Sequence, residues 1–190
     1  MSDRCGAEKR IGRGMFDKGD PMFSDPLKAE VEMVLADLRR RGLKIVTAES
    51  CTGGLIAGVL TEIAGSSDVV DRGFVTYTNE AKVAMLGVPQ QLIETLGAVS
   101  REVAEAMAAG ALARSRATIS VAVTGVAGPE GGSVAKPVGL VHIAAARVGG
   151  SVIHEECRFG AVSRSEIRER AVWSALALVR RLVATGDGKA

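Results

Sequence analysis

Apolar residues recur at helical spacing near the beginning of the chain and again at its end. Between residues 24 and 42, leucine and valine residues three or four positions apart fall on one face of a helix, and Pro26 suits its first turn. Residues 167–182 repeat this spacing, with Gly186 beyond the last apolar position. The pattern predicts two amphipathic helices, each with one face packed against a core.

Short apolar runs rich in β-branched residues alternate with helical segments between these two helices. Strands are expected at 43–49, 68–78, 118–125, 139–148 and 151–159. Helices are expected at 55–65, 79–87, 89–97 and 100–116. Gly149 and Gly150 separate the last two strands, which is typical of a hairpin. Strands that alternate with helices and end in one hairpin predict an α/β domain, a three-layer α/β/α sandwich with a mixed, mostly parallel sheet.

The length and composition of the chain predict a single domain. A chain of 190 residues with 47% hydrophobic content is long enough for one full core. Residues 1–22 mix glycine with charged residues without periodicity, so we expect a disordered tail ahead of a single domain at 23–186. The net charge of +2 gives no field that favours nucleic acid or a membrane surface as partner.

Cysteine usage and the first residues of the chain favour a reducing compartment. Cys5, Cys51 and Cys157 lie far apart and form no C-x-x-C motif, so the sequence indicates neither a disulfide framework nor a zinc site. The N-terminal residues lack the apolar core of a signal peptide, and no later segment is long and apolar enough to span a bilayer. We therefore expect a soluble, cytoplasmic protein.

The stretch TAESCTGGL at 47–55 places polar side chains where a predicted strand turns into a helix. Ser50 or Thr52 at such a turn commonly caps the helix. Unpaired N–H groups at a helix start also suit a phosphate, or the oxyanion formed when a nucleophile attacks a carbonyl. Cys51 is of a type more often buried than reactive, and no histidine lies nearby in sequence to activate it.

Two further stretches bring polar residues to strand ends, where α/β sheets form their crevices. VTYTNEAK carries Tyr77, Asn79 and Lys82, although a solvated turn explains it equally well. VTGVAGPEGGSVAKPVG holds five glycines, which allow close backbone approach to a ligand or simply form a flexible connection. His142 and His154 fall in strand patterns without metal-ligand spacing, which favours a structural role.

Taken together, TAESCTGG, GSS…RGFVTYTNEAK and AVTGVAGPEGG…KPVG, in this order and at these intervals, resemble the CinA C-terminal family over residues 26–182. The resemblance implies that family's three-layer fold and the activity of its characterised members, which are nicotinamide-nucleotide amidases. The expected reaction is hydrolysis of the carboxamide of nicotinamide mononucleotide to nicotinate mononucleotide and ammonia, in pyridine-nucleotide recycling. The larger N-terminal domain of two-domain members is not matched, so we expect the stand-alone form. Because members of the family often self-associate, the resemblance also implies a homodimer.

The resemblance also implies roles for individual residues. Ser50 matches the family's nucleophile, Lys82 its base and Tyr77 its active-site tyrosine. The implied substrate-binding residues are Glu49, Thr52, Gly53, Asn79, Thr124, Gly125, Gly128, Arg164 and Arg168. Both arginines stay candidates for one role, because RFGAVSRSEIR has Val-Ser where the family usually has Gly-Asp or Gly-Asn before the arginine.

This chemistry is physically reasonable, because a serine without a His-Asp pair needs another base and a neutral lysine is one. Burial or neighbouring positive charge would free Lys82 of its proton, and Tyr77 would relay a proton or orient Lys82. The oxyanion is expected against the N–H groups at the start of the helix after Ser50. No cofactor and no metal are expected. Two alternatives stay open, an amidase of a related nucleotide and a non-catalytic nucleotide-binding module, and the presence of both Ser50 and Lys82 favours catalysis.

Overall fold

The computed structural model describes residues 22–150 and 152–185. The expected tail at 1–22 lies outside the described residues except for Met22, and the expected helix stop at Gly186 lies outside them as well. The elements are α1 (Asp25–Arg40), β1 (Ile45–Glu49), α2 (Leu55–Glu62), the 3₁₀ turn η1 (Ser66–Asp68), β2 (Val70–Val75), α3 (Asn79–Ala81), the π-helical turn η2 (Lys82–Leu86), α4 (Gln90–Leu96), α5 (Arg101–Ala113), β3 (Ile119–Gly125), β4 (Leu140–Arg147), β5 (Val152–Arg158) and α6 (Arg164–Thr185).

One five-stranded sheet with the order β2-β1-β3-β4-β5 forms the middle of the molecule. β1 pairs in parallel with β2 and with β3, whereas β3–β4 and β4–β5 are antiparallel. The sheet is mixed, as expected, but its antiparallel share is larger than the expected mostly parallel sheet, since two of the four pairings are antiparallel. The reason is that β4 follows β3 through the loop 126–139, which contains no crossover helix to return the chain to the opposite edge.

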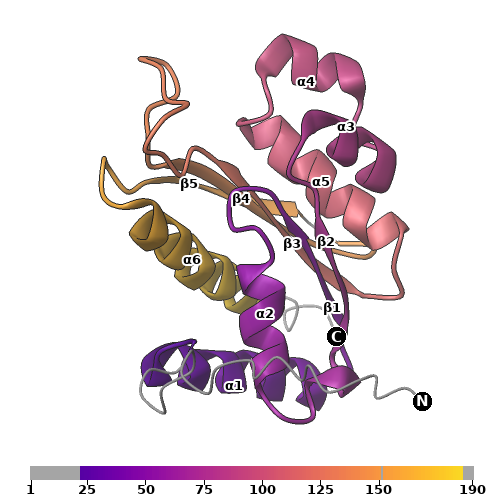
Figure 1. Cartoon of the computed structure of the whole chain (residues 1–190). Helices are drawn as coiled ribbons and strands as arrows, with labels where there is room; N and C mark the ends of the chain where they lie inside the picture. Colours follow the sequence, from indigo (N-terminus) through magenta and orange to yellow (C-terminus); the bar gives the residue numbers. More distant parts are fainter. Residues whose placement is uncertain (1–21, 151, 186–190) are drawn as a thin grey trace, which may run out of the picture.

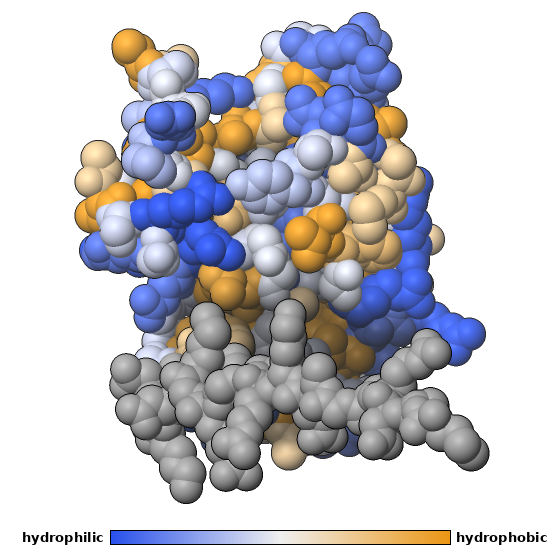
Figure 2. All heavy atoms as spheres, viewed as in Figure 1, coloured by the Kyte–Doolittle hydropathy of each residue, from blue (hydrophilic) through white to orange (hydrophobic). Residues whose placement is uncertain are grey.

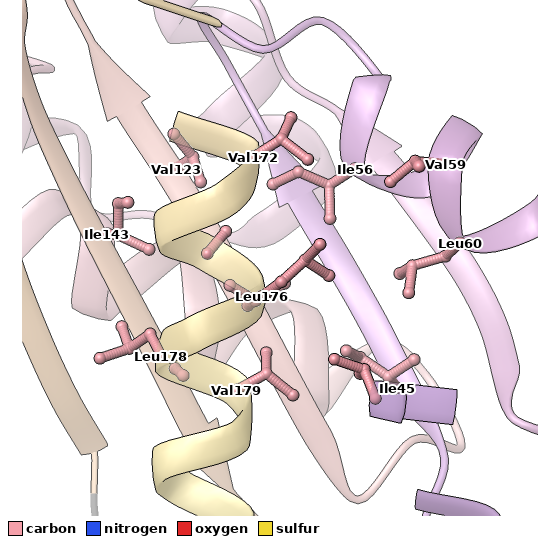
Figure 3. Close-up of a cluster of buried hydrophobic side chains, with 14 of the residues drawn as sticks. Ile45, Ile56, Val59, Leu60, Val123, Ile143, Val172, Leu176, Leu178 and Val179 are labelled. Atoms are coloured by element: carbon pink, nitrogen blue, oxygen red, sulfur yellow. The ribbon is translucent and has the colours of Figure 1, made fainter. Parts of the chain in front are cut away.

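Helices cover both faces of this sheet, which confirms the three-layer α/β/α arrangement (Figure 1). α1, α2 and α6 share one apolar cluster with the sheet, while α5, with α4 and η2, forms a second cluster on the other face. In Figure 3 the helix α6 lies beside the strand that carries Ile45, and its side chains Leu176 and Val179 point toward that strand. Full burial of each such side chain contributes about 1.5–3 kcal/mol to folding.

Apolar residues on the surface are interspersed with hydrophilic ones over the upper part of the face seen in Figure 2. Scattered apolar residues of this kind are normal on a folded protein. Within residues 22–150 and 152–185, no helix is long and apolar enough to cross a membrane.

The topology brings several chain segments to one edge of the sheet. In the parallel part, Glu49 pairs with Val75 on one side and with Val123 on the other, so β1, β2 and β3 end at the same level. The loop 126–139 leaves and re-enters the sheet at this edge, where Gly125 pairs with Val141. β5 also ends here, and α6 begins six residues after Arg158. This is the edge at which α/β sheets bind ligands.

Candidate active site

Ser50 follows β1 directly and lies at this carboxyl edge of the sheet. Its N–H donates to the carbonyl of Val123 at 3.0 Å, which fixes the first residue beyond β1 against β3. Its Oγ lies 3.1 Å from Nζ of Lys82, a residue 32 positions further along the chain. The structure therefore brings the sequence-predicted nucleophile and base into hydrogen-bond distance.

Lys82 is buried, with only 1% of its surface exposed. Its Nζ also contacts the carbonyl oxygens of Thr76 at 2.9 Å and Tyr77 at 3.4 Å, and no carboxylate lies at hydrogen-bond distance within the described residues. Burial lowers the pKa of Lys82, against smaller opposing effects of the Cys51 and Glu80 charges. Because burial outweighs these opposing effects, it raises the share of the neutral amine, which is the form a general base requires.

The backbone that carries Lys82 is an interrupted helix. Thr78 caps α3, because its Oγ1 accepts a hydrogen bond from the N–H of Ala81 at 3.1 Å. At Lys82 the α-helical turn passes into the π-helical turn η2, which runs to Leu86. π-Helical turns within helices are frequent at functional sites. The sequence predicted one plain helix at 79–87.

A cavity of about 290 Å³ opens beside the Ser50–Lys82 pair, close to the lower limit of typical small-molecule sites. Eight of the predicted site residues line it: Ser50, Tyr77, Asn79, Lys82, Thr124, Gly125, Gly128 and Arg164. The four others, Glu49, Thr52, Gly53 and Arg168, do not line it and lie around the turn behind Ser50. The structure thus separates a cavity-lining set from a supporting set, which lies around the turn.

Glu49 belongs to the supporting set, in contrast to the substrate-binding role expected for it. Its side chain is fully buried, and its carboxylate accepts hydrogen bonds from the N–H groups of Gly54, Ile56 and Ala57 at 2.8–3.0 Å. The Thr47 hydroxyl donates to the same carboxylate at 3.1 Å. Glu49 therefore caps α2. The N–H groups expected to receive an oxyanion at this helix start are already used.

Neither hydroxyl in the Ser50–Thr52 stretch caps α2, which removes that reading of the motif. Thr52 Oγ1 is buried without a hydrogen-bond partner among the described residues. Arg168 of α6 donates instead to the backbone carbonyl of Thr52 at 2.8 Å. Arg164 is the arginine that lines the cavity, so the structure distinguishes the two candidates by position.

Arg164 stands at the rim of the cavity and connects two of its walls. Its guanidinium donates to the Tyr77 hydroxyl at 2.9 Å and to the Gly128 carbonyl at 2.7 Å. The Tyr77 hydroxyl therefore points to Arg164, and only the Tyr77 carbonyl contacts Lys82. Tyr77 was expected to relay a proton or to orient Lys82. In this structure its main-chain carbonyl contacts Lys82, and its hydroxyl does not.

Several cavity residues were missed by sequence reasoning. These are Cys51, Ala98, Val99, Val126, Ala127, Glu130 and Gly131. Thr124 explains part of this wall, because its hydroxyl donates to the carbonyl of Ala98 at 2.8 Å and holds the α4–α5 connection against β3. The segment around Ala98 offers no polar signal in the sequence. Glu130 was visible in the glycine-rich loop as its one acidic residue.

Cys51 is buried, as its residue type indicated, and the structural role expected for the two histidines stays a prediction. Cys51 is buried in the apolar core, and burial raises the pKa of its thiol to about 12. His142 and His154 stack with ring centroids 5.3 Å apart, outside the cavity. Among the described residues no group of three or more His, Cys, Asp and Glu side chains is placed to hold a metal ion.

A second hollow of about 360 Å³ lies between η2 and α4 and shares only Asn79 with the cavity beside Ser50. Its floor includes Val83 and Ile93, and Glu80 and Glu94 are also among its lining residues. It contains no nucleophile with a base beside it. The serine–lysine pair therefore makes the smaller cavity the candidate active site.

Fold and site together define an α/β/α domain with a buried serine–lysine pair at the carboxyl edge of its sheet. The family model of the CinA C-terminal domain matches residues 27–183. The chain belongs to this family, as its motifs indicated.

Relatives and solved structures agree with this assignment. A CinA-like protein from Anaeromyxobacter sp. (strain Fw109-5) is 45% identical over 168 residues, which are 88% of this chain and 40% of that protein. The crystal structure of the competence/damage inducible protein CihA from Agrobacterium tumefaciens is 55% identical, with a TM-score of 0.84, covering 86% of this chain and 99% of that one. A CinA superfamily protein from Escherichia coli is 34% identical with a TM-score of 0.78, covering 87% and 96%. The names of these proteins refer to competence and damage and to no reaction.

Proposed function

We propose that the chain hydrolyses the carboxamide of nicotinamide mononucleotide, with Ser50 as nucleophile and Lys82 as base. The observation that carries this proposal is the 3.1 Å contact between Ser50 Oγ and the buried Nζ of Lys82. A neutral amine has two N–H groups and one lone pair. The carbonyls of Thr76 and Tyr77 accept the two N–H groups, which leaves the lone pair for the Ser50 hydroxyl.

The proposed reaction proceeds in two balanced steps. The Ser50 oxygen forms a bond to the carboxamide carbon while its proton passes to Lys82, and the resulting ammonium donates that proton to the leaving nitrogen as the C–N bond breaks. Ammonia leaves and an acyl ester stays on Ser50. A water molecule then attacks the ester, gives a proton to Lys82 and releases nicotinate mononucleotide, and the proton returns to Ser50.

The oxyanion formed in each step needs donors other than the start of α2. Glu49 already accepts the N–H groups of Gly54, Ile56 and Ala57. In the described part of the chain, the N–H groups of Cys51 and Thr52 make no backbone–backbone hydrogen bond, and that of Cys51 faces its own sulfur. Because these two groups directly follow the nucleophile, we assign the oxyanion to them.

Ammonia release tests the proposed function directly. Purified protein should release ammonia from nicotinamide mononucleotide, and to a much smaller extent from nicotinamide, its riboside or NAD, because the pocket is proposed to fit the mononucleotide. The rate should be unchanged by a chelator, since the proposed steps use no metal. An enzyme-coupled ammonia assay with Ser50→Ala as blank measures both.

The outcomes separate the alternatives. Ammonia released only from another amide would keep the serine–lysine amidase and replace its substrate. Binding of the nucleotide without ammonia release from any amide would favour a non-catalytic nucleotide-binding module. Loss of activity with the chelator and its return with a divalent ion would contradict the metal-free mechanism.

Arg164→Ala should raise KM for nicotinamide mononucleotide by about 10- to 10²-fold with a smaller effect on kcat, as expected for loss of charged hydrogen bonds made equally in ground and transition states. The exposed guanidinium at the cavity rim is placed to bind the substrate phosphate. Steady-state kinetics measure the effect, and the riboside, which lacks the phosphate, serves as matched substrate. An unchanged KM for the mononucleotide would remove Arg164 from phosphate binding.

A further inference from the structure

We infer that Glu49 and Arg168 are positioning residues that clamp the turn 51–54 from opposite sides and so hold Ser50 and the oxyanion donors in reactive geometry. This inference rests on the proposed function, because it assigns the two residues a role in the reaction of Ser50. Neither residue lines the cavity. Their effect is therefore expected on the chemical step and not on substrate affinity.

Glu49 holds the C-terminal end of the turn. Its carboxylate takes the N–H of Gly54, the last residue of the turn, at 3.0 Å, and it takes two further N–H groups from the first turn of α2. With the Thr47 hydroxyl it accepts four hydrogen bonds within 3.1 Å, in full burial. Charge-assisted hydrogen bonds of this kind are short and strong, so the turn is fixed relative to β1.

Arg168 holds the middle of the same turn from the side of α6. Its Nη2 donates to the Thr52 carbonyl at 2.8 Å, across 116 positions of sequence. Gly53 makes this approach possible, because its φ is +61° and a Cβ there would lie 3.3 Å from Nη2 of Arg168. The guanidinium thus lies directly against the backbone of the turn.

The two contacts fix the peptide groups on the far side of the turn. Arg168 takes the carbonyl of the 52–53 peptide and Glu49 takes the N–H of the 53–54 peptide. The N–H of Thr52 lies on the preceding peptide, between the Arg168 contact and the hydrogen bond from the Ser50 N–H to Val123 that holds the start of the turn. The N–H of Thr52 donates to no backbone acceptor among the described residues, and that of Cys51 faces only its own sulfur, as expected of donors open to an oxyanion. Preorganised donors of this type need no reorientation during the reaction.

The test compares Glu49→Gln and Arg168→Met with wild type in two assays. The first assay gives kcat and KM for nicotinamide mononucleotide. The second gives the rate at which Ser50 reacts with a small neutral fluorophosphonate, in which the serine oxygen displaces fluoride, with Ser50→Ala as blank. We expect kcat and the labelling rate to fall at least about tenfold in both variants while KM stays within about twofold.

Matched variants show whether the effect is specific to the turn. Arg181→Ala removes an exposed guanidinium further along α6 that pairs with Glu155, and both assays should be unchanged. Arg168→Lys keeps a cationic donor for the Thr52 carbonyl, and it should recover part of the labelling rate lost in Arg168→Met. A role in folding alone would lower the melting temperature without this pattern.

The outcomes separate the clamp from the proposed function. Wild-type labelling and kcat values in Glu49→Gln and Arg168→Met, or a rise in KM alone, would overturn the clamp. Labelling of wild-type Ser50 without turnover of the mononucleotide would refute the proposed substrate, and the labelling rates would still test the clamp. Absence of Ser50-dependent labelling and turnover in wild type would overturn both. If Glu49→Gln does not fold, Arg168→Met and its rescue by lysine decide the matter.

Discussion

Ser50→Ala is expected to abolish ammonia release from nicotinamide mononucleotide, with a loss of about 10⁴-fold or more, as for other enzymes that lose their nucleophile. The Oγ of Ser50 is the oxygen that contacts Lys82, at 3.1 Å. Nucleotide binding should persist, because the rest of the cavity, including Arg164, is untouched. Calorimetric titration with the mononucleotide, next to the ammonia assay, measures the two effects separately.

Cys51→Ala is the matched control, because it changes the adjacent residue of the same turn. The thiol is buried in the core and its pKa is raised to about 12, so it is protonated at neutral pH and does not act as a nucleophile. The variant should stay active and lose about 1 kcal/mol of stability from the smaller side chain. Mass spectrometry of a trapped acyl-enzyme should find the adduct in Cys51→Ala. An adduct that survives Ser50→Ala and disappears with Cys51 would refute the assignment.

Lys82→Met should lower turnover by at least about 10²-fold, the lower range for loss of a general base. Methionine keeps much of the apolar stem and removes only the amine, so the buried surroundings are preserved. In wild type, kcat/KM should rise with pH as Lys82 loses its proton, with a midpoint below the ordinary lysine value of 10.5 because burial lowers this pKa. This rising limb should be absent from the residual activity of the variant.

The same pKa shift has a predicted effect on stability. Between the lowered pKa of Lys82 in the folded protein and its ordinary value of 10.5, the unfolded chain binds a proton that the folded protein does not, so the free energy of unfolding rises with pH. Lys82→Met removes the titrating amine from both the folded and the unfolded state. At neutral pH the variant should therefore melt at the same or a higher temperature than wild type. A lower melting temperature would show that the contacts of Lys82 to the carbonyls stabilise the fold by more than its burial costs.

The turnover of the same variant tests the mechanism. Turnover close to wild type would remove Lys82 from it.

Much of the site was predictable because strand ends can be recognised in sequence. The apolar run before Ser50 and the run before Thr124 each end in polar or glycine residues, and parallel strands place such ends at one edge. The contact between Ser50 and Lys82 was implied by family resemblance alone. The π-helical turn that begins at Lys82 leaves no recognisable pattern in the local sequence.

The sequence placed the supporting residues with the substrate-binding set, but they do not line the cavity. A motif shows which residues are close together along the chain, and it does not show where each side chain points. Glu49 stands inside the motif beside Ser50, yet its side chain turns to the start of α2. A signal was present, since a carboxylate at the end of a buried strand needs several hydrogen-bond donors and a helix start offers them. Arg168 lay far away in sequence, and its contact with Thr52 depends on how α6 packs across the sheet.

The antiparallel half of the sheet was only partly visible. Gly149 and Gly150 indicated the β4–β5 hairpin, which the structure confirms. The β3–β4 pairing depends on whether the loop 126–139 returns along the same edge, and loop composition does not determine this. The sequence gives no sign that Ala98 and Val99 line the cavity, because their side chains are apolar. The contact that holds this segment is a hydrogen bond to the main-chain carbonyl of Ala98.

The burial of Cys51 also bears on how the protein responds to oxidants. Peroxide and disulfide reagents attack the thiolate, and a core thiol with a pKa of about 12 offers almost none at neutral pH. A serine nucleophile has no corresponding oxidation chemistry. With Ser50 and Lys82 as its reacting groups, the proposed hydrolysis would continue at the same rate under oxidative stress that inactivates cysteine-dependent amidases.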